Sequence, residues 1–513
     1  MTKPSTLPVP LPNLLRGLEL LSSSDIENIP IRDIHFDSRQ VTTGSLFVAF
    51  QGLRKNGHDY IEQALVNGAT ALVVERPPSH LSLPRRVPVA HVPDGRRALS
   101  VLAANFYGHP SRKLKVVGVT GTNGKTTSTF MLDTIFQESG YRTGLLGSLL
   151  KKIDRHLSTS GITTPDAPQL HRALMEMVKA GVTYATIEVS SHGLLFHRVA
   201  DVHFEAAGIT NITEDHPDIH PNQEHYIRVK SRLFQQLPPG KTALLNLDDA
   251  GAACILPCAG KHRLTYGLHD PNADLKAEAL VLGPYSSRFD LIFSGHANEF
   301  LHPGAPTRVT VELKAPGIHN IYNALLAAAA ALACGLPLES IVSGLRTFQG
   351  IPRRMQVVYN GKFQVIDDFA HNPASLEAVF NCLNHKLFSN LLLVHAIRGN
   401  RGEKINRANA RTIAMIGARL GFKEIISTDS SDCVQEKDRV CDSERTAFIE
   451  ELQKAGFRIH HESLLSDAIR RAIKTAGKGD LVLLTGAQGM DQGATIVNQI
   501  LQGEGEKGRT QNK

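Results

Sequence analysis

The chain has 513 residues and a formal net charge of +7, with 42% hydrophobic and 20% charged residues. This composition is that of a soluble globular protein, and the length exceeds what one hydrophobic core supports, so we expect several domains. Basic residues are spread along the sequence, and only 6% of the residues are aromatic. This distribution argues against a nucleic-acid surface and favours anionic small molecules, such as nucleotides, as ligands.

The six cysteines contain no C-x-x-C pair, which indicates reduced thiols rather than a disulfide framework or a zinc site. No stretch of the sequence approaches the ~18 apolar residues that a membrane-spanning helix needs. We therefore expect a cytoplasmic monomer that binds neither a membrane nor a nucleic acid.

Residues 1–112 are predicted to form a first α/β domain. The sequence Gly108-His109-Pro110 marks its end, because glycine and proline interrupt regular structure. Strands are expected at Leu46–Phe50 and Ala71–Glu75, and helices at Tyr60–Asn67 and Ala98–Tyr107.

Residues 113–349 form the second predicted domain, in which strands and helices alternate. It opens with an apolar strand at Leu114–Thr120, a glycine-rich turn, and a helix from Thr126 to Ser139 that Gly140 terminates. This alternation predicts a mostly parallel, doubly wound sheet. Further strands are expected at Tyr184–Val189 and Ala207–Asn211, and further helices at Gln223–Leu237 and Asn320–Cys334.

Residues 350–513 are predicted to form a third domain, again of the α/β class. Its polar tail, from Gly503 to Lys513, is expected to be frayed. Strands are expected at Phe363–Ile366, Asn390–His395, Glu424–Thr428 and Asp480–Thr485, and helices at Ser375–Leu383, Ala408–Gly417, Ser443–Ala455 and Leu465–Ala476.

The strongest local signal is a phosphate-binding loop between the first strand and the first helix of the second domain. Its glycines let backbone N–H groups turn toward an oxyanion, and the following helix N-terminus adds partial positive charge. Lys125 can reach the outer phosphates of a nucleotide, and the Thr126 hydroxyl can ligate Mg²⁺. The loop is a variant of the Walker A sequence, because Val119 stands where glycine is usual. It comprises Gly121, Thr122, Asn123, Gly124, Lys125, Thr126 and Thr127.

The loop resembles the ATP loop of the Mur ligase superfamily, and other segments resemble its UDP-N-acetylmuramoyl-tripeptide synthetase branch (MurE). The resemblance weakens past residue 395. It implies a UDP-sugar-binding domain, a central P-loop ATPase domain with a parallel sheet, and a Rossmann-like C-terminal domain that binds the amino acid. The segments, in the family's order, are Asp37-Ser38-Arg39, Thr163-Thr164-Pro165, Glu188–His192, Asn211–His216, Lys230–Phe234 and Asp368–Pro373.

Two side chains that follow predicted strands are candidate metal ligands. Glu188 ends a strand, and a carboxylate at the carboxyl end of a parallel strand lies at the ligand edge of the sheet, with oxygens that suit Mg²⁺. Taken alone, Glu188 or His216 is more typical of an exposed loop. The resemblance makes Glu188 and Thr126 ligands of one Mg²⁺, and makes His216 and Lys230 ligands of a second.

Lys230 lies in the helix expected at 223–237, on the same face as Tyr226, Leu233 and Phe234. A lysine in an apolar stripe either extends to solvent or is buried, and burial disfavours its charge. The resemblance implies that the neutral amine adds CO₂ and becomes a carbamate. The catalytic set that the resemblance implies is Lys125, Glu188, His216, Lys230 and Arg354.

Further residues are assigned to the nucleotide and to the acceptor substrate by the resemblance. Arg354 resembles an arginine that the third domain brings to the γ-phosphate, where a planar cation offsets developing charge. Asn320 and Asn323 are implied to lie near the base, although each alone is as typical of a surface amide. Asp368 and His371 belong to the nucleotide motif of the third domain. The UDP-muramoyl-peptide is implied to contact Ser38, Arg39, Gln51-Gly52, Thr163, Thr164, Ser190 and Arg198.

The predicted amino-acid pocket departs from the family pattern. Members that add diaminopimelate carry Asp-Asn-Pro-Arg there, whereas this chain has Asp-Ser-Ser-Asp from Asp429 to Asp432. An acid in place of the arginine that grips the distal carboxylate favours a basic substrate such as lysine. Asp491 stands near the family's later glutamate, and Arg401 can hold the α-carboxylate. Phe196 stands where many members have glutamine.

Two Mg²⁺ ions, a lysine and an arginine around a triphosphate indicate phosphoryl transfer. The resemblance implies an ATP-dependent ligase that activates the terminal carboxylate of a UDP-N-acetylmuramoyl-dipeptide as an acyl-phosphate, which the amine of an amino acid then attacks. The Asp37-Ser38-Arg39 segment argues against a folate or another peptide as acceptor. A third domain containing Arg354 and Asp368 argues against a P-loop kinase, and the complete catalytic set argues against a non-catalytic Mur-like binding protein.

Overall fold

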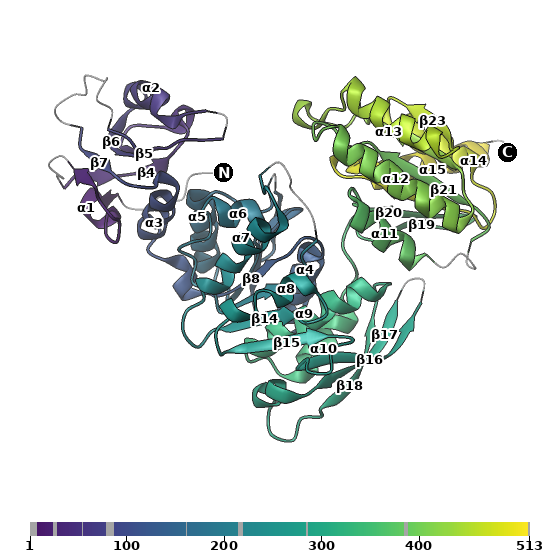
Figure 1. The fold of residues 1–513 in the computed structure, drawn as a ribbon, viewed down its shortest axis with the longest axis horizontal. Helices are drawn as coiled ribbons and strands as arrows, with labels where there is room; N and C mark the ends of the chain where they lie inside the picture. Colours follow the sequence, from purple (N-terminus) through teal and green to yellow (C-terminus); the bar gives the residue numbers. More distant parts are fainter. Residues whose placement is uncertain are drawn as a thin grey trace. The chain divides into compact units, whose positions relative to one another are not determined.

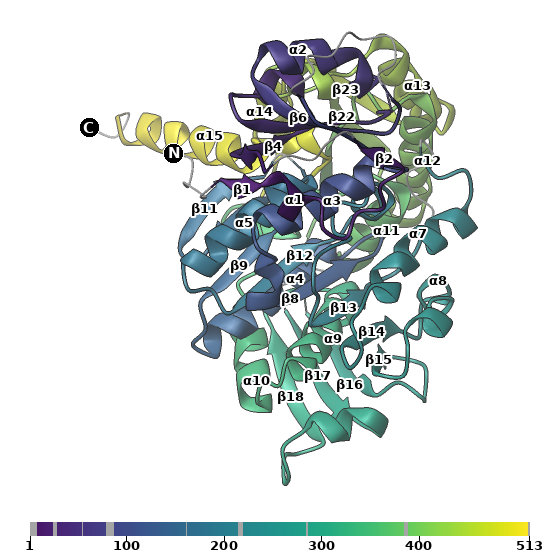
Figure 2. The same cartoon turned by 90° about the vertical axis from the view of Figure 1, so that its left-hand side faces the viewer.

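The computed structural model describes residues 8–23, 28–53, 55–77, 87–160, 162–213, 219–283, 286–383 and 388–510 (Figures 1 and 2). The chain divides into two compact units. The first comprises Met1–Glu278, Leu291–Val309 and Tyr322–Leu345, and the second comprises Ala279–Asp290, Thr310–Ile321 and Arg346–Lys513. No helix within the described ranges is long and apolar enough to span a membrane.

The N-terminal part of the first unit is built on a five-stranded sheet with the order β2-β7-β6-β5-β4. Strands β5 and β6 are parallel neighbours and are almost wholly buried, because both sequences are apolar runs. The four elements predicted here are confirmed, with α3 beginning earlier, at Gly95, behind the capping side chain of Asp94. The elements are β1 (Val9–Pro10), α1 (Leu11–Leu14), β2 (Ser22–Ser23), β3 (Pro30–Ile31), β4 (Asp33–His35), β5 (Ser45–Ala49), α2 (Ile61–Val66), β6 (Ala69–Val74), β7 (Val89–His91) and α3 (Gly95–Phe106).

An eleven-stranded sheet follows, with the order β11-β10-β9-β12-β8-β13-β14-β15-β16-β17-β18. Strand β8 has β12 and β13 as parallel neighbours, so the predicted parallel core is confirmed. The sheet is mixed, because β10 pairs antiparallel with β9 and with β11. Its strands are β8 (Lys115–Thr120), β9 (Thr143–Leu146), β10 (Leu150–Ile153), β11 (His156–Thr159), β12 (Tyr184–Glu188), β13 (Ala206–Ile209), β14 (Thr242–Asn246), β15 (Arg263–Gly267), β16 (Leu275–Leu282), β17 (Ser287–Phe293) and β18 (Arg308–Leu313).

The helices that accompany this sheet are amphipathic or wholly apolar. Helices α5 and α7 contribute to the same core cluster as β12 and β13, and α4 packs on β9 and β12. The helices are α4 (Lys125–Glu138), α5 (Ala167–Lys179), α6 (Ser191–Leu195), α7 (Gln223–Gln235), α8 (Ala250–Ala253), α9 (Ile318–Ala333) and α10 (Leu338–Thr347).

The second unit contains a six-stranded sheet with the order β19-β20-β24-β21-β22-β23, which is parallel except for β19 (Figure 1). Adjacent residues of β20, Val365 and Ile366, belong to different core clusters, because successive strand residues point to opposite faces. Helices α12 and α13 pack together. The elements are β19 (Gln356–Asn360), β20 (Gln364–Asp368), α11 (Pro373–Cys382), β21 (Leu391–Ala396), α12 (Glu403–Leu420), β22 (Glu424–Thr428), α13 (Asp442–Lys454), β23 (Arg458–Glu462), α14 (Leu465–Thr475), β24 (Leu481–Thr485) and α15 (Gly493–Thr510).

Two sequence-based expectations for this unit are corrected. Helix α12 begins five residues before the predicted start at Ala408, because Glu403 and the residues after it continue the helix into a polar, amphipathic turn. The tail expected to be frayed from Gly503 is instead helical to Thr510, as a continuation of α15. Its glutamate, lysine and arginine residues favour helix despite three glycines.

Candidate active site

The glycine-rich loop lies between β8 and α4, as predicted. Gly121 and Gly124 have φ angles of 138° and 85°. An added Cβ would lie 1.8 Å from Thr210 Oγ1 at Gly121, and 2.3 Å from Asn323 Oδ1 at Gly124. Because only glycine fits at both positions, the backbone of the loop can approach an oxyanion closely.

Asn211, which follows β13, holds the loop in this conformation. Its backbone oxygen accepts a hydrogen bond from Thr122 N at 2.8 Å, and its Oδ1 accepts one from Asn123 N at 3.1 Å. Lys125 begins α4, and Thr127 is buried in its first turn. The first N–H groups of a helix have no partner within the helix, so the start of α4 offers donors to an anion.

Lys125 lies over the loop that precedes it. Its Nζ donates to Gly121 O and to Thr122 O, each at 2.9 Å. An ammonium group in this position is close to where the outer phosphates of a nucleotide meet a loop of this type.

Glu188 is fully buried at the end of β12, beside the phosphate loop. Its carboxylate accepts hydrogen bonds from Thr126 Oγ1 at 3.0 Å, from Ser148 N at 3.0 Å and from Ser148 Oγ at 2.9 Å. A Cβ added to Gly147 would lie 2.2 Å from Glu188 Oε1, so this approach also requires glycine. The expectation that Glu188 lies at the ligand edge of the sheet therefore agrees with its surroundings.

The oxygens of Thr126 and Glu188 fit Mg²⁺. This ion commonly binds one or two carboxylates and completes its shell with substrate phosphates and water. Within the described ranges, no group of three or more histidine, cysteine, aspartate or glutamate side chains could hold a metal ion.

Lys230 is buried on α7, with 1% of its surface exposed, so the alternative that it extends to solvent is wrong. Its Nζ donates to Gly121 O at 2.9 Å and lies 3.4 Å from Thr120 Oγ1. It also lies 4.5 Å from the centre of the Tyr226 ring. Lys230 and Lys125 thus converge on one carbonyl oxygen of the loop. His216, the other predicted ligand of the second metal, lies outside the described residues.

Four of the residues predicted to contact the acceptor substrate are linked to Glu188 by hydrogen bonds. Thr163 Oγ1 accepts from Ser148 Oγ at 3.0 Å. Thr164 Oγ1 donates to Glu188 O at 2.8 Å and lies 3.0 Å from Ser190 Oγ. Arg198 donates to Thr164 O at 2.8 Å. These side chains, from four separate segments, form one continuous network.

Ser38 and Arg39 lie apart from this network, in a short 3-10 helix that follows β4 of the N-terminal sheet. Ser38 Oγ donates to Gln63 Oε1 at 3.0 Å. Arg39 forms an ion pair with Asp37 at 2.6 Å, which lowers the pKa of Asp37. Gln51 N donates to Glu75 Oε2 at 2.9 Å, which fixes the start of the loop that was predicted to hold the diphosphate.

The predicted nucleotide motif of the third domain gathers at the end of β20, in the second unit. Asp368 is buried and accepts hydrogen bonds from two backbone N–H groups, at 2.7 and 2.8 Å. Burial raises the pKa of Asp368, and the positive charge of Arg354 opposes that rise. The Arg354 guanidinium lies 5.0 Å from the centre of the Phe369 ring. His371 Nδ1 lies 2.8 Å from Phe369 O.

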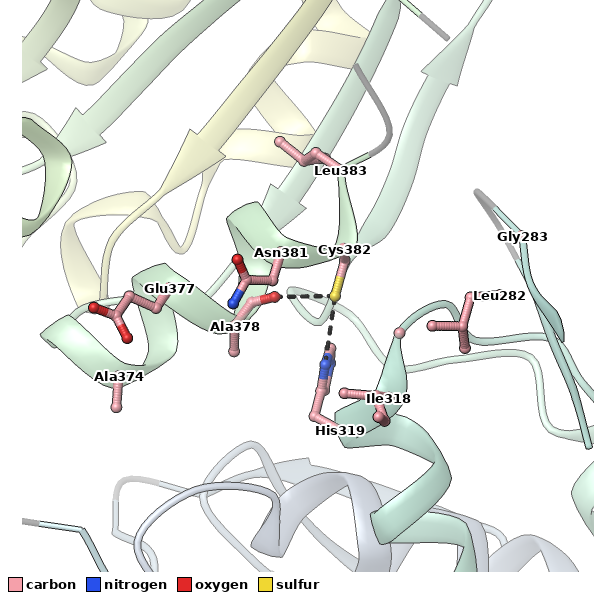
Figure 3. Close-up of a pocket in the computed structure, with 11 residues that line it drawn as sticks. Leu282, Gly283, Ile318, His319, Ala374, Glu377, Ala378, Asn381, Cys382 and Leu383 are labelled. Carbon is pink, nitrogen blue, oxygen red and sulfur yellow. Dashed lines mark hydrogen bonds between the residues drawn. The ribbon is translucent and has the colours of Figure 1, made fainter. Parts of the chain in front are cut away.

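A cavity of about 630 Å³ lies between the start of α9 and α11, within the second unit (Figure 3). His319 and Cys382 point toward one another in it, with Cys382 Sγ 3.4 Å from His319 Nδ1. Burial lowers the pKa of His319 to about 4 and raises the pKa of Cys382 to about 12, so both side chains are neutral. Asn320 follows His319 and is buried, whereas Asn323 belongs to the first unit.

Arg353, the residue before the predicted catalytic arginine, has a structural role. Its guanidinium pairs with Asp367 at 3.3 Å and with Asp491, and it donates to the backbone oxygens of Gly486 and Ala487. Its φ angle of 61° is unusual for a residue other than glycine. Burial raises the pKa of Asp367 to about 6. Asp491, predicted to contact the substrate, is therefore engaged by Arg353.

The two acids of the predicted amino-acid pocket are also engaged. Asp432 accepts hydrogen bonds from the backbone N–H groups of Leu465 and Ser466, at 2.8 and 3.2 Å, and thereby caps α14. Asp429 pairs with Arg445 at 2.6 Å, and it lies 3.5 Å from His461. The preference for lysine was inferred from an uncompensated acid at Asp432. That inference loses its basis, because the direction of a side chain depends on tertiary contacts that the sequence pattern does not contain.

Arg401 lies in a loop that a buried glutamate organises. Glu444 accepts hydrogen bonds from the backbone N–H groups of Asn400, Arg401 and Gly402, at 2.9, 2.8 and 2.6 Å. Burial raises the pKa of Glu444, but these N–H groups outweigh that effect and the net shift is downward. The Arg401 guanidinium lies 3.2 Å from Asp438 and is partly exposed.

Comparison with known proteins decides the family. Three sequence profiles match: "Mur ligase family, catalytic domain" at residues 30–107, "Mur ligase middle domain" at 119–331 and "Mur ligase, glutamate ligase domain" at 353–488. A Clostridium botulinum protein named UDP-N-acetylmuramoyl-L-alanyl-D-glutamate–2,6-diaminopimelate ligase is 35% identical over 459 residues, which are 89% of this chain and 90% of that protein. The chain belongs to the Mur ligase family. A Roseiflexus protein named UDP-N-acetylmuramyl-tripeptide synthetase is 36% identical over 484 residues, or 90% of each chain.

Solved structures agree with this assignment. A structure titled as a UDP-N-acetylmuramoyl-L-alanyl-D-glutamate–2,6-diaminopimelate ligase matches with a TM-score of 0.65 and 26% identity over 94% of each chain. A Thermotoga maritima MurF ligase, solved with ADP, shares the fold at a TM-score of 0.61 and 17% identity, covering 93% of this chain and 98% of that one. This Mur ligase therefore has the three-domain α/β architecture of its family and is an ATP-dependent ligase of peptidoglycan precursor synthesis.

The sequence analysis of this Mur ligase did not single out Ser148, which donates two of the three hydrogen bonds to Glu188. Ser148 follows β9, and only the pairing of β9 with β12 brings it to that carboxylate. The available signal was the short apolar run at Thr143–Leu146 with Gly147 after it. A strand there would end at the same edge of the sheet as β12.

Proposed function

We propose that this Mur ligase transfers the γ-phosphoryl group of ATP to the terminal carboxylate of a UDP-N-acetylmuramoyl-dipeptide. The carboxylate oxygen attacks the γ-phosphorus, and the bond between that phosphorus and the bridging oxygen of ADP breaks. The amine of the incoming amino acid then attacks the carbonyl carbon of the acyl-phosphate. Phosphate leaves, the amine loses a proton, and an amide bond remains.

The observation that carries this proposal is the convergence of polar groups on one loop. Lys125 and Lys230 both donate to Gly121 O, and Thr126 Oγ1 donates to Glu188 at 3.0 Å. A positioned cation and oxygen ligands for Mg²⁺ beside a glycine-rich loop are what phosphoryl transfer requires, because charge develops on the transferred group.

We extend the proposal to the metal and to the modified lysine. Thr126 and Glu188 would hold one Mg²⁺, and His216 with a carbamate on Lys230 would serve a second. When bound, the metal would neutralise phosphate charge. The burial of Lys230 supports the carbamate, because a buried amine is neutral more readily and only the neutral amine adds CO₂.

The ligand roles assigned by resemblance are part of the same proposal. They comprise the nucleotide roles of Asn320, Asn323, Asp368, His371 and Arg354, the substrate roles of Ser38, Arg39, Thr163, Thr164, Ser190, Arg198 and Arg401, and domain boundaries at residues 112 and 349.

For the amino acid, we propose diaminopimelate. The Clostridium botulinum relative carries that amino acid in its name. Asp432 caps the start of α14, and Asp429 is balanced by Arg445, so neither of these two acids is left uncompensated to oppose a distal carboxylate. Initial rates with meso-diaminopimelate and L-lysine, at saturating ATP and UDP-N-acetylmuramoyl-dipeptide, test this choice. A higher kcat/KM for lysine would reject diaminopimelate as the preferred amino acid, but it would leave the proposed ligase reaction unchanged.

Isotope transfer tests the reaction itself. The dipeptide substrate is prepared with ¹⁸O in its terminal carboxylate, and the phosphate released with ATP and amino acid is analysed by mass spectrometry. We expect one ¹⁸O atom in each phosphate, because an acyl-phosphate leaves with an oxygen of the carboxylate. Phosphate without ¹⁸O, or release of ADP without the dipeptide substrate, contradicts the proposal.

A further inference from the structure

Arg96 is held between two aromatic rings in the first unit. Its guanidinium carbon lies 4.8 Å from the centre of the Phe50 ring and 4.4 Å from the centre of the Phe196 ring. Phe50 follows β5 and Phe196 caps α6, so segments far apart in the sequence build the sandwich. Aromatic faces on both sides fix the plane of a guanidinium group and leave its N–H groups at the edge to bind a ligand.

Among the described residues, Arg96 differs from the neighbouring Arg97 and Arg198 because it forms no ion pair with a carboxylate. Arg97 pairs with Asp201, and Arg198 pairs with Asp166 at 2.8 Å. In the part of the chain that the structure describes, Arg96 forms no ion pair, and its hydrogen bond goes to Gln51 O at 3.3 Å. Burial lowers its pKa, so the charged guanidinium is poorly solvated where it lies.

The acids nearest to Arg96 are committed to other groups. Glu75 accepts hydrogen bonds from Gln51 N and Gly95 N, each at 2.9 Å. Asp94 caps α3 by accepting from Arg97 N at 2.9 Å. Both carboxylates act on Arg96 through their charge, but neither forms an ion pair with it in the part of the chain that the structure describes.

A second cation faces the same ring. The guanidinium of Arg198 lies 5.8 Å from the centre of the Phe196 ring. The charge of Arg198 acts on Arg96, and so do the opposite charges of Glu75, Asp166 and Asp94. Within the described residues, Asp166 is the one of these acids that forms an ion pair with either arginine. Two neighbouring guanidinium groups, of which Arg96 has no ion-pair partner among the described residues, can together donate hydrogen bonds to one anionic group.

We propose that Arg96, oriented by Phe50 and Phe196, binds together with Arg198 an anionic group, a phosphate or a carboxylate, of the UDP-linked acceptor substrate. This inference rests on the proposed function. Arg198 also donates to Thr164 O at 2.8 Å, and Thr164 is linked to Glu188, so the pair of arginines continues the network beside the phosphate loop.

The variant Arg96→Gln tests the proposal, with Arg97→Gln as the matched control on the same helix. Affinities of the full-length protein are measured by calorimetry for UDP, UDP-N-acetylglucosamine and UDP-N-acetylmuramoyl-L-alanyl-D-glutamate. KM and kcat are measured with the last of these. We expect Arg96→Gln to raise KM about 10- to 100-fold with kcat changed less than about threefold, because charge-assisted hydrogen bonds are lost. Arg97→Gln should leave KM within about threefold of the wild-type value.

The three ligands separate the possible anions. If Arg96→Gln binds all three ligands more weakly, Arg96 contacts the diphosphate that they share. If it binds only the muramoyl-dipeptide more weakly, Arg96 contacts a carboxylate of that ligand. Unchanged affinity for all three ligands overturns the inference. If the wild-type protein binds none of them and forms no amide, the proposed function fails, and this inference fails with it.

The role of Phe196 is tested by combining variants. Phe196→Gln should weaken binding about three- to tenfold in the wild-type background and have almost no effect when Arg96→Gln is already present, because the ring acts through the guanidinium. An equal loss in both backgrounds contradicts a positioning role for the ring. Phe196→Tyr keeps the aromatic face and should restore wild-type affinity.

Discussion

The loop around Gly121 and the loop around Asp429 both carry residues that the sequence predicts to be functional. The side chains at the first loop converge on one site, whereas those at the second loop stabilise neighbouring structure. At the first loop, Lys125 and Thr126 from α4 and Lys230 from α7 converge on a few oxygen atoms. At the second loop, Asp429 pairs with Arg445, and Asp432 caps the start of α14.

This difference shows how to separate function from architecture at charged positions. Polar groups that converge from several elements on one buried point cost stability unless a ligand or a reaction needs them. Acids that cap helices or pair with neighbours stabilise the fold where they stand. We therefore expect variants at the first loop to change chemistry with little change in thermal stability, and variants at the second loop to do the opposite.

The largest effect is expected for Lys125→Ala. Removing the ammonium over the phosphate loop should reduce kcat at least about 1000-fold, because developing charge on the phosphoryl group loses its cation. Lys113 is exposed and precedes β8, so it lies away from the loop that follows this strand. The matched control Lys113→Ala should therefore keep its activity. If Lys125→Ala released ADP at nearly the wild-type rate, the assignment of ATP binding to this loop would be wrong.

A somewhat smaller loss, about 100-fold or more, is expected for Lys230→Ala. Acetate or formate should partly restore its activity by replacing the carbamate, whereas neither should help Lys125→Ala. Mass spectrometry of the native protein under CO₂ should show the added carbamate mass on Lys230. An unmodified lysine in the fully active enzyme contradicts the modification.

Ser148→Ala gives a graded test of the network around Glu188. The variant keeps the backbone donor to Glu188 but loses the hydroxyl, so we expect about a tenfold lower kcat/KM and a higher requirement for Mg²⁺. The exposed Ser158 on β11 supplies the control Ser158→Ala. Wild-type dependence on Mg²⁺ in Ser148→Ala would mean that the network does not set the metal site.

The smallest effect on catalysis is expected for Asp432→Ala, at the second loop. Loss of the cap on α14 should lower the free energy of unfolding by about 1 kcal/mol, visible as a lower Tm. The ratio of kcat/KM for meso-diaminopimelate and L-lysine should stay the same. A change in that ratio of more than about fivefold would show that Asp432 contacts the amino-acid substrate. The second loop would then be functional like the first.

Local sequence patterns predicted most elements and the phosphate loop itself, whereas the roles of Glu188 and Lys230 beside it came from the resemblance to the family. The spacing of Gly121, Gly124 and Lys125 defines a loop that needs no distant information. The apolar face around Lys230 predicted a buried or snorkelling lysine, and the structure decides for burial. These features are predictable because contacts within one turn or one strand produce them.

Features that depend on pairing between distant segments could not be predicted. Ser148 reaches Glu188 only because β9 lies next to β12. Arg96 meets Phe196 only after α3 packs near α6, and neither residue type signals this in its own segment. Asp432 was expected to face a pocket, whereas its direction is set by α14, which begins more than thirty residues later.

The strand order of the second unit has a consequence for how the chain folds as it is made. Strands β20 and β21 follow one another in the sequence but do not pair, because β24, the last strand of the sheet, lies between them and is parallel to both. Until β24 has been synthesised, each has an unpaired edge, and such edges promote aggregation. The centre of this sheet therefore closes late, and a chain that stops before Leu481 leaves an open sheet for chaperones to protect.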